Sequence, residues 1–590
     1  MPIFNSSLII MASFLPLFFL TGMEGRLLIP LGIAFIVALI ASTIVALTLT
    51  PVLCSYLLDG KNSKKNVVSE DPFVTRKLKE GYRKFLHLCF EYKKIVLTSV
   101  LALFLIALGL FFTLGRSFLP SFNEGSFTIN VSLMPGVSLE ESDKLGREAE
   151  KLILSVPEIK TVSRKTGRAE LSEHSFGVNV SEIEAPYELK DRSKSQVMKE
   201  LREKLSVIPG ANIEIGQPIS HRIDAMLSGS RAQIAIKIFG NDLNTLYTKG
   251  SQIKKLISEI PGIVDVNVEQ QKARPQIHIS PKRDLLARYG IKMNDFRQFI
   301  NTALAGEVVS QVYDHSLPYD MTLRFDEKDR NSIDKIKNLM IDSNEGKIPL
   351  SHVANIVSTD GPNTINRENV SRRIIVSANV SDRDLRGAIN EIQSKISSNI
   401  NLGEGYYIVY GGQFENEEHA SKTLAITSII ALVIIITLLY HEFRNMTEAA
   451  IILLNLPLAM IGGVFILKMS SGELNIPAII GFISLLGITT RNGMLLMSRY
   501  NHLKAEGIGL RERVYRGSLD RLLPIVMTAL TSALALIPLA LKGSEPGNEI
   551  QSPMAVVILG GLFSSTILNV IIVPIVYYLT NLKKERNESV

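Results

Sequence analysis

One charged residue stands inside an otherwise uncharged apolar segment of this sequence. The segment is GFISLLGITTRNGMLLMS, residues 481–498, and the charged residue is Arg491. A charge at the centre of a membrane costs about 2.5–3.5 kcal/mol on insertion scales, so such a residue usually has a partner and a function. Thr528 lies in the next apolar run. At 1.5 Å per residue, Arg491 and Thr528 lie about 10–12 Å inside their runs, which puts them at similar depths.

A second group of side chains has the chemistry of metal ligands. Glu173 and His174 occur in SEHSFGVNV, and His221, Asp224 and Met226 occur in SHRIDAM. Imidazole and carboxylate groups suit borderline divalent ions such as zinc, cobalt or nickel, whereas thioethers suit copper(I) or silver(I). Isolated histidine and methionine residues are also common as ordinary surface or core residues. The residues alone therefore leave a metal site and plain packing both open.

Several other classes of chemistry have no support in the sequence. The only cysteines are Cys54 and Cys89, which gives no basis for a thiolate metal site or a catalytic thiol. The chain has no Gly-rich phosphate loop, no H-E-x-x-H pair and no G-x-S-x-G elbow. An enzyme, a bound cofactor and transport driven by ATP on this chain are therefore all disfavoured. For a transporter, an ion gradient is the energy source that remains.

Long uncharged apolar runs are the elements that would position Arg491 and Thr528. They cover residues 1–23, 27–58, 95–115, 423–440, 449–467, 474–490 (continuing past Arg491 to Ser498), 522–541 and 551–582. Each run is close to or above the roughly 17–25 residues that a spanning helix needs. The sequence therefore predicts a polytopic α-helical membrane protein with eight spans.

The net charge of +7 is concentrated between and after these runs. Lys and Arg residues crowd residues 59–94, 499–516 and 583–590. These segments fall on one side of the membrane if the spans alternate, and the positive-inside rule makes that side the cytoplasm. Topology thus explains the basic charge without nucleic acid. It also places residues 116–422 outside the cytoplasm as one large block.

The pattern of the external block is α+β and repeats. SFTINVSLM, IKTVSRKTG, SFGVNVSEIEAPYEL and ANIEIGQ alternate like strands, and two segments of helical spacing separate them, the first capped by Ser138. This is the β-α-β-β-α-β order of ferredoxin-like folds. The order recurs between AQIAIKIFG and GYYIVYGG, with PQIHISP (275–281) expected as a strand of the second unit. A turn-rich insertion over residues 294–362 interrupts that second unit.

Several strings resemble those of resistance–nodulation–division (RND) exporters, in their heavy-metal-efflux branch. They include LTGMEGRLLIPLGIAFIVALIASTIVALTLTPVL, LPSFNEGSFTINVSLMPGVSLEES, ISHRIDAMLSG, GITTRNGMLLMSRY and RLLPIVMTALTSALALIPLAL. The resemblance covers essentially the whole chain but only the back half of the family's pattern. It implies a C-terminal half that opens at the family's fifth span. The missing N-terminal half would come from a split gene or be lost by truncation.

The expected division of the chain follows from the spans, the repeat and this resemblance. It assigns spans five and six to residues 1–58, a cytoplasmic basic loop to 59–94, a span to 95–115 and a first periplasmic ferredoxin-like unit to 116–229. A second unit takes 230–293 and 363–415, and a docking-type subdomain is inserted at 294–362. Spans eight to twelve take 422–582, and a cytoplasmic tail takes 583–590.

The resemblance also implies roles for individual residues. In RND exporters a basic residue at the position of Arg491 pairs with aspartates of the fourth span, and a threonine at the position of Thr528 joins that proton relay. This chain has no Asp or Glu inside any of its apolar runs. Arg491 is therefore interpreted as a counter-charge for a carboxylate on the missing half, with a purely structural arginine as the alternative. For Thr528 the alternative is a bond to its own helix.

The expected substrate also depends on the resemblance. Copper- and silver-exporting members carry a methionine triad, and the matching places here are Asn130, Val180 and Ala225. The expectation is a secondary active transporter of the bacterial inner membrane that exports divalent heavy metals by proton antiport. It would form a trimer and work with a periplasmic adaptor and an outer-membrane channel. Export of organic compounds and an inactive remnant that only binds partners stay open as alternatives.

Overall fold

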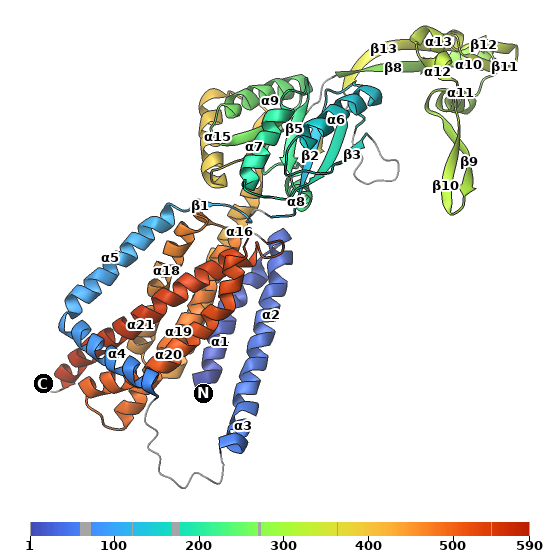
Figure 1. Cartoon of the computed structure of the whole chain (residues 1–590). Coiled ribbons are helices and arrows are strands. Elements are labelled where there is room, and N and C mark those ends of the chain that lie inside the picture. The colour runs from blue at the N-terminus through green and yellow to red at the C-terminus, as the bar shows by residue number, and fades with distance from the viewer. Residues whose placement is uncertain are drawn as a thin grey trace.

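A helical bundle carries two β-sheets at one end, and a third, smaller part projects beyond them (Figure 1). The computed structural model describes residues 2–58, 72–120, 122–167, 177–269, 273–362, 364–543 and 545–588. A two-residue parallel pairing joins the parts of the chain at the boundary between bundle and sheets. It links β1 (Gly115–Arg116) to β17 (Glu473–Leu474). Segments far apart in sequence thus meet at this boundary.

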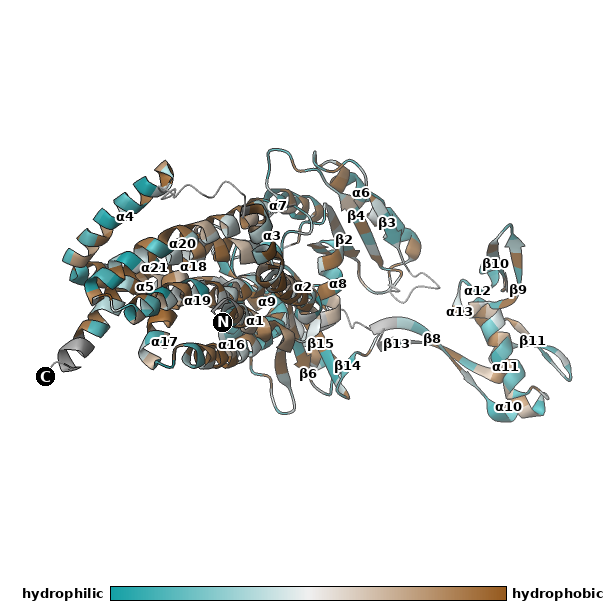
Figure 2. Ribbon diagram, turned by 90° about the horizontal axis from the view of Figure 1, so that it is seen from below, coloured by the Kyte–Doolittle hydropathy of each residue, from teal (hydrophilic) through white to brown (hydrophobic). Residues whose placement is uncertain are grey.

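The bundle is built from the two ends of the chain. The N-terminal part contributes α1 (Pro2–Phe14), the 3₁₀ turn η1 (Leu15–Phe19), α2 (Gly22–Leu47), α3 (Leu49–Leu58), α4 (Phe73–Glu91) and α5 (Lys93–Phe112). The C-terminal part contributes α16 (Gln413–Phe443), α17 (Met446–Leu453), α18 (Asn455–Met469), α19 (Ile476–Ala505), α20 (Leu510–Leu541) and α21 (Gln551–Glu588). Apolar residues dominate these helices except α4, which is largely hydrophilic (Figure 2).

Seven of the eight predicted spans correspond to helices long and apolar enough to cross a membrane within the described residues. The first predicted span is different, because residues 1–23 contain only a shorter apolar helix, Phe4–Phe19. Pro16 lies in the 3₁₀ turn that follows α1, where proline fixes its own backbone and supplies no N–H. The α-helix therefore ends at Phe14, and the expected first span is cut short.

The predicted cytoplasmic loop 59–94 also differs from the expectation. Within its described part, Phe73–Glu91 form the helix α4. Thr75, Leu86 and Cys89 are buried against the bundle, at spacings that place them on one side of a helix. The basic residues between them suggested a loop, but this amphipathic spacing produces a packed helix.

The first sheet has the predicted chain order. Its elements are β2 (Ser126–Ser132), α6 (Leu139–Leu154), β3 (Ser163–Thr166), β4 (Val180–Pro186), α7 (Lys194–Leu205) and β5 (Asn212–Gly216). The strands are antiparallel in the order β3-β4-β2-β5. Phe127, Ile153 and Leu201 are fully buried between the sheet and its two helices. Ser138 caps α6 as expected, because its hydroxyl accepts from the Glu141 N–H.

The second sheet repeats this order with an interruption. Its elements are β6 (Ile234–Phe239), α9 (Leu243–Ser258), β7 (Ile263–Val268), β15 (Ser371–Val380), α15 (Leu385–Asn399) and β16 (Tyr407–Gly412). The strands lie in the order β16-β6-β15-β7, with β14 (Arg367–Glu368) added beside β15. β6 is buried along its whole length, as a central strand covered by helices must be.

The inserted part starts earlier than predicted. β8 (Ala273–Pro281) pairs with β13 (Ala354–Pro362) as a separate two-stranded ribbon and not with the second sheet. The boundary at residue 294 and the placement of PQIHISP in the second unit were therefore wrong. Alternating residues predict a strand but not its partner, and Ile277 is 46% exposed in this ribbon. The ribbon leads to a small core around Phe296 and Leu350 and to an exposed hairpin of β9 (Glu307–Asp314) and β10 (Leu317–Leu323).

Two glycines allow a close backbone contact between α18 and α21. A Cβ at Gly462 of α18 would lie 2.0 Å from the Gly560 carbonyl oxygen of α21, and a Cβ at Gly560 would lie 2.5 Å from the Gly462 carbonyl oxygen. Small residues let helix backbones approach where no hydrophobic effect drives association. The backbone contact therefore depends on the absence of both side chains.

We expect Gly462→Ala to destabilise the bundle by about 1–3 kcal/mol, because the added methyl must separate two packed backbones. The matched control is Gly109→Ala in the middle of α5, where nothing lies within 4 Å of an added Cβ. The control should be neutral or slightly stabilising because alanine favours helix more than glycine does. Unfolding of the purified chain in detergent, followed by circular dichroism, measures both. Equal effects of the two substitutions would contradict the contact.

Candidate functional site

The helix α8 (Pro218–Ser228) carries two of the predicted metal ligands into a cavity. Its start is fixed by Pro218 in the first turn and its end by Gly229 in the left-handed region. His221 and Asp224 are three residues apart, so they share a helix face. Both are buried, with exposed fractions of 6% and 4%. The cavity has a volume of about 620 Å³ and lies between the sheets and the adjoining end of the bundle.

Asp224 is held by the first residue of a bundle helix. Its Oδ1 accepts a 2.8 Å hydrogen bond from Nε2 of Gln413, which begins α16. Burial raises the pKa of Asp224 to about 7, and the bond from Gln413 offsets only part of this effect. The carboxyl is therefore close to its titration midpoint at neutral pH.

The pKa of His221 is shifted in the opposite direction to that of Asp224. Burial and the positive charge of Arg231 lower the pKa of His221 to about 4. Its Nδ1 lies 3.5 Å from Asn130 Nδ2, and its buried Nε2 has no hydrogen-bond partner among the described residues. Gly216 leaves the room for this ring, since a Cβ there would lie 2.0 Å from Nε2. The imidazole is thus neutral at physiological pH and keeps an unused nitrogen.

The other predicted ligands do not join this pair within the described residues. Met226 belongs to α8 but is 64% exposed. Glu173 and His174 lie outside the residues that the structure describes. No group of three or more His, Cys, Asp and Glu side chains that could hold a metal ion occurs in the described ranges. The five-residue ligand set therefore stays a prediction, and the structure brings only His221 and Asp224 to one cavity.

Arg231 is a residue of the cavity that the sequence did not single out. Its Nη1 donates to Asn130 Oδ1 at 2.9 Å and lies 3.6 Å from Glu182 Oε2. Asn130 stands at a place where copper- and silver-exporting relatives were expected to carry methionine. Its amide oxygen is occupied by Arg231 instead. The other two such places, Val180 in β4 and Ala225 in α8, offer no soft ligand either.

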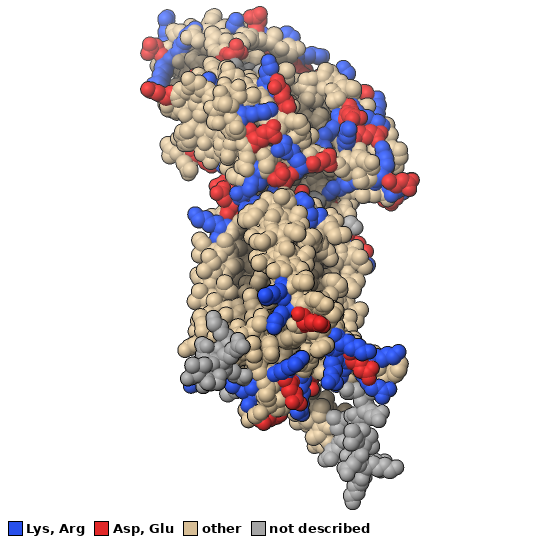
Figure 3. Space-filling model, turned by 90° about the vertical axis from the view of Figure 1, so that its left-hand side faces the viewer, with Lys and Arg blue, Asp and Glu red and all other residues tan. Residues whose placement is uncertain are grey.

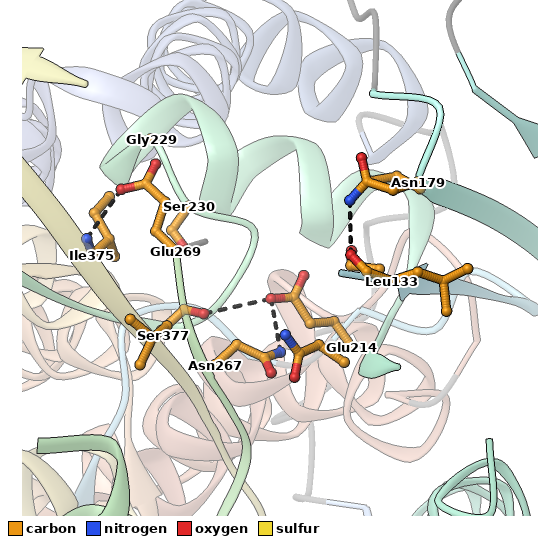
Figure 4. Close-up of a pocket in the computed structure, with 13 residues that line it drawn as sticks. Leu133, Asn179, Glu214, Gly229, Ser230, Asn267, Glu269, Ile375 and Ser377 are labelled. Atoms are coloured by element: carbon orange, nitrogen blue, oxygen red, sulfur yellow. Dashed lines mark hydrogen bonds between the residues drawn. The ribbon is translucent and has the colours of Figure 1, made fainter. Parts of the chain in front are cut away.

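A second, smaller cavity lies in the same cleft between the two sheets (Figure 4). It has a volume of about 260 Å³ and is lined on opposite sides by Glu214 and Glu269. Asn267 Nδ2 donates to Glu214 at 3.2 Å and the Ser377 hydroxyl donates to it at 3.4 Å. Burial raises the pKa of both carboxyls. The sequence gave no reason to single out Glu214 and Glu269, because polar and apolar residues alternate in most strands and a glutamate at a polar position is common.

An ion pair joins the two units that form the cleft. Arg202 of α7 donates to both carboxylate oxygens of Asp265 in β7, at 2.8 and 2.9 Å. Asp265 also accepts from Asn379 Nδ2 at 3.0 Å and adopts a positive φ of 53°. Such a two-pronged arginine–carboxylate pair fixes orientation as well as distance. It sets the separation of the units beside the larger cavity, which Arg202 also lines.

The proposed relay residues lie elsewhere, inside the bundle. Arg491 is half-buried in α19, and the described residues give its guanidinium no hydrogen bond or ion pair. The Thr528 hydroxyl donates to the Pro524 carbonyl of its own helix at 2.8 Å. That bond agrees with the plain structural interpretation of Thr528. No contact between the two side chains is recorded in the described part of the chain, so their shared role stays a prediction.

Comparison with known proteins shows which family has this architecture. The profile of the AcrB/AcrD/AcrF family matches residues 1–581. The chain belongs to this family. It is 33% identical over 594 residues to protein HelA of Legionella pneumophila, and 31% identical over 601 residues to the cobalt-zinc-cadmium resistance protein CzcA of Cupriavidus metallidurans. The RND resemblance read from the sequence is thereby confirmed.

The alignments cover nearly all of this chain and about half of each relative. They span 98% of this chain and 56% of HelA, and 100% of this chain and 56% of CzcA. A crystal structure of a heavy metal efflux pump superposes with a TM-score of 0.84 at 29% identity, covering 98% of this chain and 58% of that one. The chain therefore has the fold of about half of such a protein.

The raised pKa of Asp224 predicts a measurable pH dependence of stability. The carboxyl titrates near pH 7 in the folded chain, against a reference value of 3.8. Its contribution to stability is thus fully present below about pH 4 and is lost as the pH rises to about 7, by up to about 1.4 kcal/mol per pH unit. Asp224→Asn cannot ionise, so its stability relative to the wild type should rise over that range.

Chemical unfolding followed by circular dichroism at several pH values measures this difference. Asp191→Asn is the control, since it makes the same change at an exposed position. His221 is present in all three proteins, so its own titration cancels. Parallel pH profiles for the wild type and Asp224→Asn would show that the carboxyl is not desolvated.

Proposed function

We propose that this chain is the C-terminal half of a proton-driven RND permease that exports divalent heavy-metal cations. The observation that carries the proposal is the match of almost the whole chain to relatives named for cobalt, zinc, cadmium and nickel resistance. In this proposal the bundle spans the bacterial inner membrane and the two sheets are periplasmic ferredoxin-like units. The ribbon and hairpin of the inserted part form a docking subdomain. The working pump is a trimer that contains the missing half, a periplasmic adaptor and an outer-membrane channel.

The chemistry of the cleft supports a divalent cation as substrate. His221 offers an unprotonated imidazole with a free nitrogen, and Asp224 offers a carboxyl that ionises near neutral pH. These are ligand types that zinc, cobalt and nickel accept. The nearby positive charge of Arg231 opposes a cation, but Glu182 and Glu214 act on that arginine with the opposite charge. No methionine replaces Asn130, which disfavours copper(I) and silver(I).

The proton pathway in this proposal needs a carboxylate from another chain. Arg491 carries a permanent charge within an apolar helix, and the described residues provide it with no acidic partner. Ion pairing inside the bundle would offset much of the cost of that charge. We propose that an aspartate of the missing half supplies the pair. Protonation of that aspartate would then weaken the pair and couple proton entry to helix movement.

Export of an organic compound is the second candidate, and one observation favours it. Phe118, Phe122 and Met198 line the larger cavity beside the polar residues. Apolar walls with a few polar groups are typical of sites for small organic molecules. The two substrate classes differ in which residues they need. A metal depends on His221 and Asp224, whereas an organic ligand depends on the apolar wall.

We expect the chain, expressed together with its N-terminal half, to give a metal-sensitive host tolerance to zinc, cobalt or nickel. His221→Ala with Asp224→Ala should reduce tolerance at least tenfold in metal concentration, because two ligands are lost. Met198→Ala is the control, since it changes the same cavity without removing a ligand of this class. No metal tolerance from the paired halves, together with export of an organic compound that Met198→Ala lowers and the double variant does not, would favour an organic substrate. Tolerance from this chain alone would contradict the half-permease proposal.

Arg491→Ala should abolish metal-dependent proton flux in vesicles that contain both halves, while insertion into the membrane is unchanged. Arg491→Lys should keep part of the flux, because the charge stays and only the planar donor fork is lost. Thr528→Ala should do less harm, since it removes one neutral bond within α20. Flux is measured with a pH-sensitive dye after a metal pulse. Full flux with Arg491→Ala would reduce the arginine to a structural residue.

A further inference from the structure

The helix α4 has three different faces, and only one of them packs on the protein. It lies at the end of the bundle away from the sheets, where it turns back from α5 (Figure 1). The packed face carries Thr75, Leu86 and Cys89, which are buried. Phe90 on its margin packs against Tyr515 in a tilted arrangement and against Tyr578 edge-on, at centroid distances of 5.4 Å each. This contact fixes the rotation of α4 about its own axis.

One hydrogen bond fixes the position of α4 along the bundle. The Tyr82 hydroxyl donates to the Val570 carbonyl of α21 at 2.7 Å. Pro574 lies four residues after Val570 and has no N–H, so that carbonyl lacks its usual partner within the helix. Tyr82 supplies the missing donor. The buried face of α4 is therefore anchored to the bundle by packing and by a polar contact that α21 needs.

The second face of α4 is apolar and faces away from the protein. Val74, Leu78, Phe85, Leu88 and Tyr92 are 75%, 40%, 48%, 52% and 50% exposed. At 100° per residue these side chains fall within about 80° of the helix circumference, so they form one stripe. The packing of α4 on the bundle does not use this stripe. Water would be an unfavourable environment for it.

The stripe continues into a surface that is already apolar. Beyond the turn at Tyr92, α5 exposes Ile95, Leu101 and Leu105, each more than half exposed. Only 6% of the most apolar window of α5 is buried inside the protein. A helix with these properties meets lipid tails when it spans a membrane. The stripe of α4 therefore joins the edge of a lipid-facing surface.

The third face of α4 is polar and mainly basic. Lys77 and Lys84 are exposed and follow within about 40° of the edge of the apolar stripe. Lys77 Nζ lies 4.6 Å from the centroid of the Phe73 ring, so its stem runs over apolar surface. The described residues record no ion pair for either lysine. Lys and Arg side chains gather at this end of the molecule, below a belt with little charge (Figure 3).

We propose that α4 binds anionic phospholipid, with its apolar stripe among the acyl chains and Lys77 and Lys84 on headgroup phosphates. The proposal depends on the order of the faces around α4. The face on the protein is followed by the apolar stripe, then by the two lysines, and then by the face toward water. That order matches a membrane interface crossed from the inside outward, where basic side chains meet negative headgroups. A soluble protein partner would not need the lysines beside the stripe. The continuity with α5 also places the stripe at lipid depth.

Native mass spectrometry of the full chain in mild detergent tests the proposal. The chain is titrated with phosphatidylglycerol or with phosphatidylcholine, and the bound lipids are counted. The wild type should retain phosphatidylglycerol preferentially. Lys77→Gln with Lys84→Gln should lower that retention at least threefold. The charge-matched control is Lys144→Gln with Lys151→Gln, which removes two exposed lysines of α6 on the first sheet and should change nothing.

Additional variants and measurements separate lipid binding from misfolding and from binding of another protein. Lys77→Arg with Lys84→Arg should restore lipid retention, because a headgroup needs positive charge, and this separates binding from misfolding. Inorganic phosphate should not compete, since it brings no acyl chains. Hydrogen exchange of residues 73–91 should slow in nanodiscs with phosphatidylglycerol relative to phosphatidylcholine alone. Equal lipid retention by wild type and the glutamine variant would overturn the proposal. So would protection of α4 that appears only when another protein is present. None of these measurements requires transport activity.

Discussion

Polar groups inside an apolar bundle are stabilised by partners within the protein, and several contacts between the helices described here meet this need. Proline breaks the internal bonding of α21, and Tyr82 from a different helix donates to the carbonyl that Pro574 leaves free. The Ser564 hydroxyl lies between α18 and α21 and donates to the Leu458 carbonyl at 2.8 Å. Thr528 returns its hydroxyl to its own helix. Arg491 has no recorded hydrogen bond or ion pair among the described residues, a state it shares with the buried amide oxygens of Asn455 and Asn492, but of these three side chains only Arg491 carries a charge.

Burial also determines the properties of polar groups in the cleft between the sheets, where it changes their pKa values. Burial there shifts the carboxyl of Asp224 and the imidazole of His221 in opposite directions, and each shift favours the neutral form. At pH 7 the imidazole of His221 is therefore neutral, and the carboxyl of Asp224 is close to half ionised. A site of this kind can accept a proton or a cation without a large change in its surroundings. The Arg202–Asp265 pair preserves the cleft because it holds one unit against the other.

The sequence predicted the features that depend on local periodicity. Apolar runs of sufficient length predicted seven of the membrane-type helices, and alternating residues predicted the repeated β-α-β-β-α-β order. Features that depend on tertiary partners were missed. β8 alternates like any strand, but only its pairing with β13 shows that it leaves the second sheet. α4 was interpreted as a loop because its basic residues outweighed its apolar spacing. Arg231, Glu214 and Glu269 became visible only where separate strands brought them to one cleft.

The connection between cleft and bundle is short, and it is built from the first turns of one helix. α16 begins at Gln413, which donates to Asp224, and one turn later Glu417 is paired with Arg386 of α15. The same helix then continues as a candidate span to Phe443 and packs against α1 and α19. A ligand that takes the Asp224 oxygen from Gln413 would release one of the bonds that hold the start of this helix. α16 has no break between that end and its contacts with α19, so both lie on one continuous helix. The chain therefore contains a direct physical path from the cleft residues to the helix that carries Arg491.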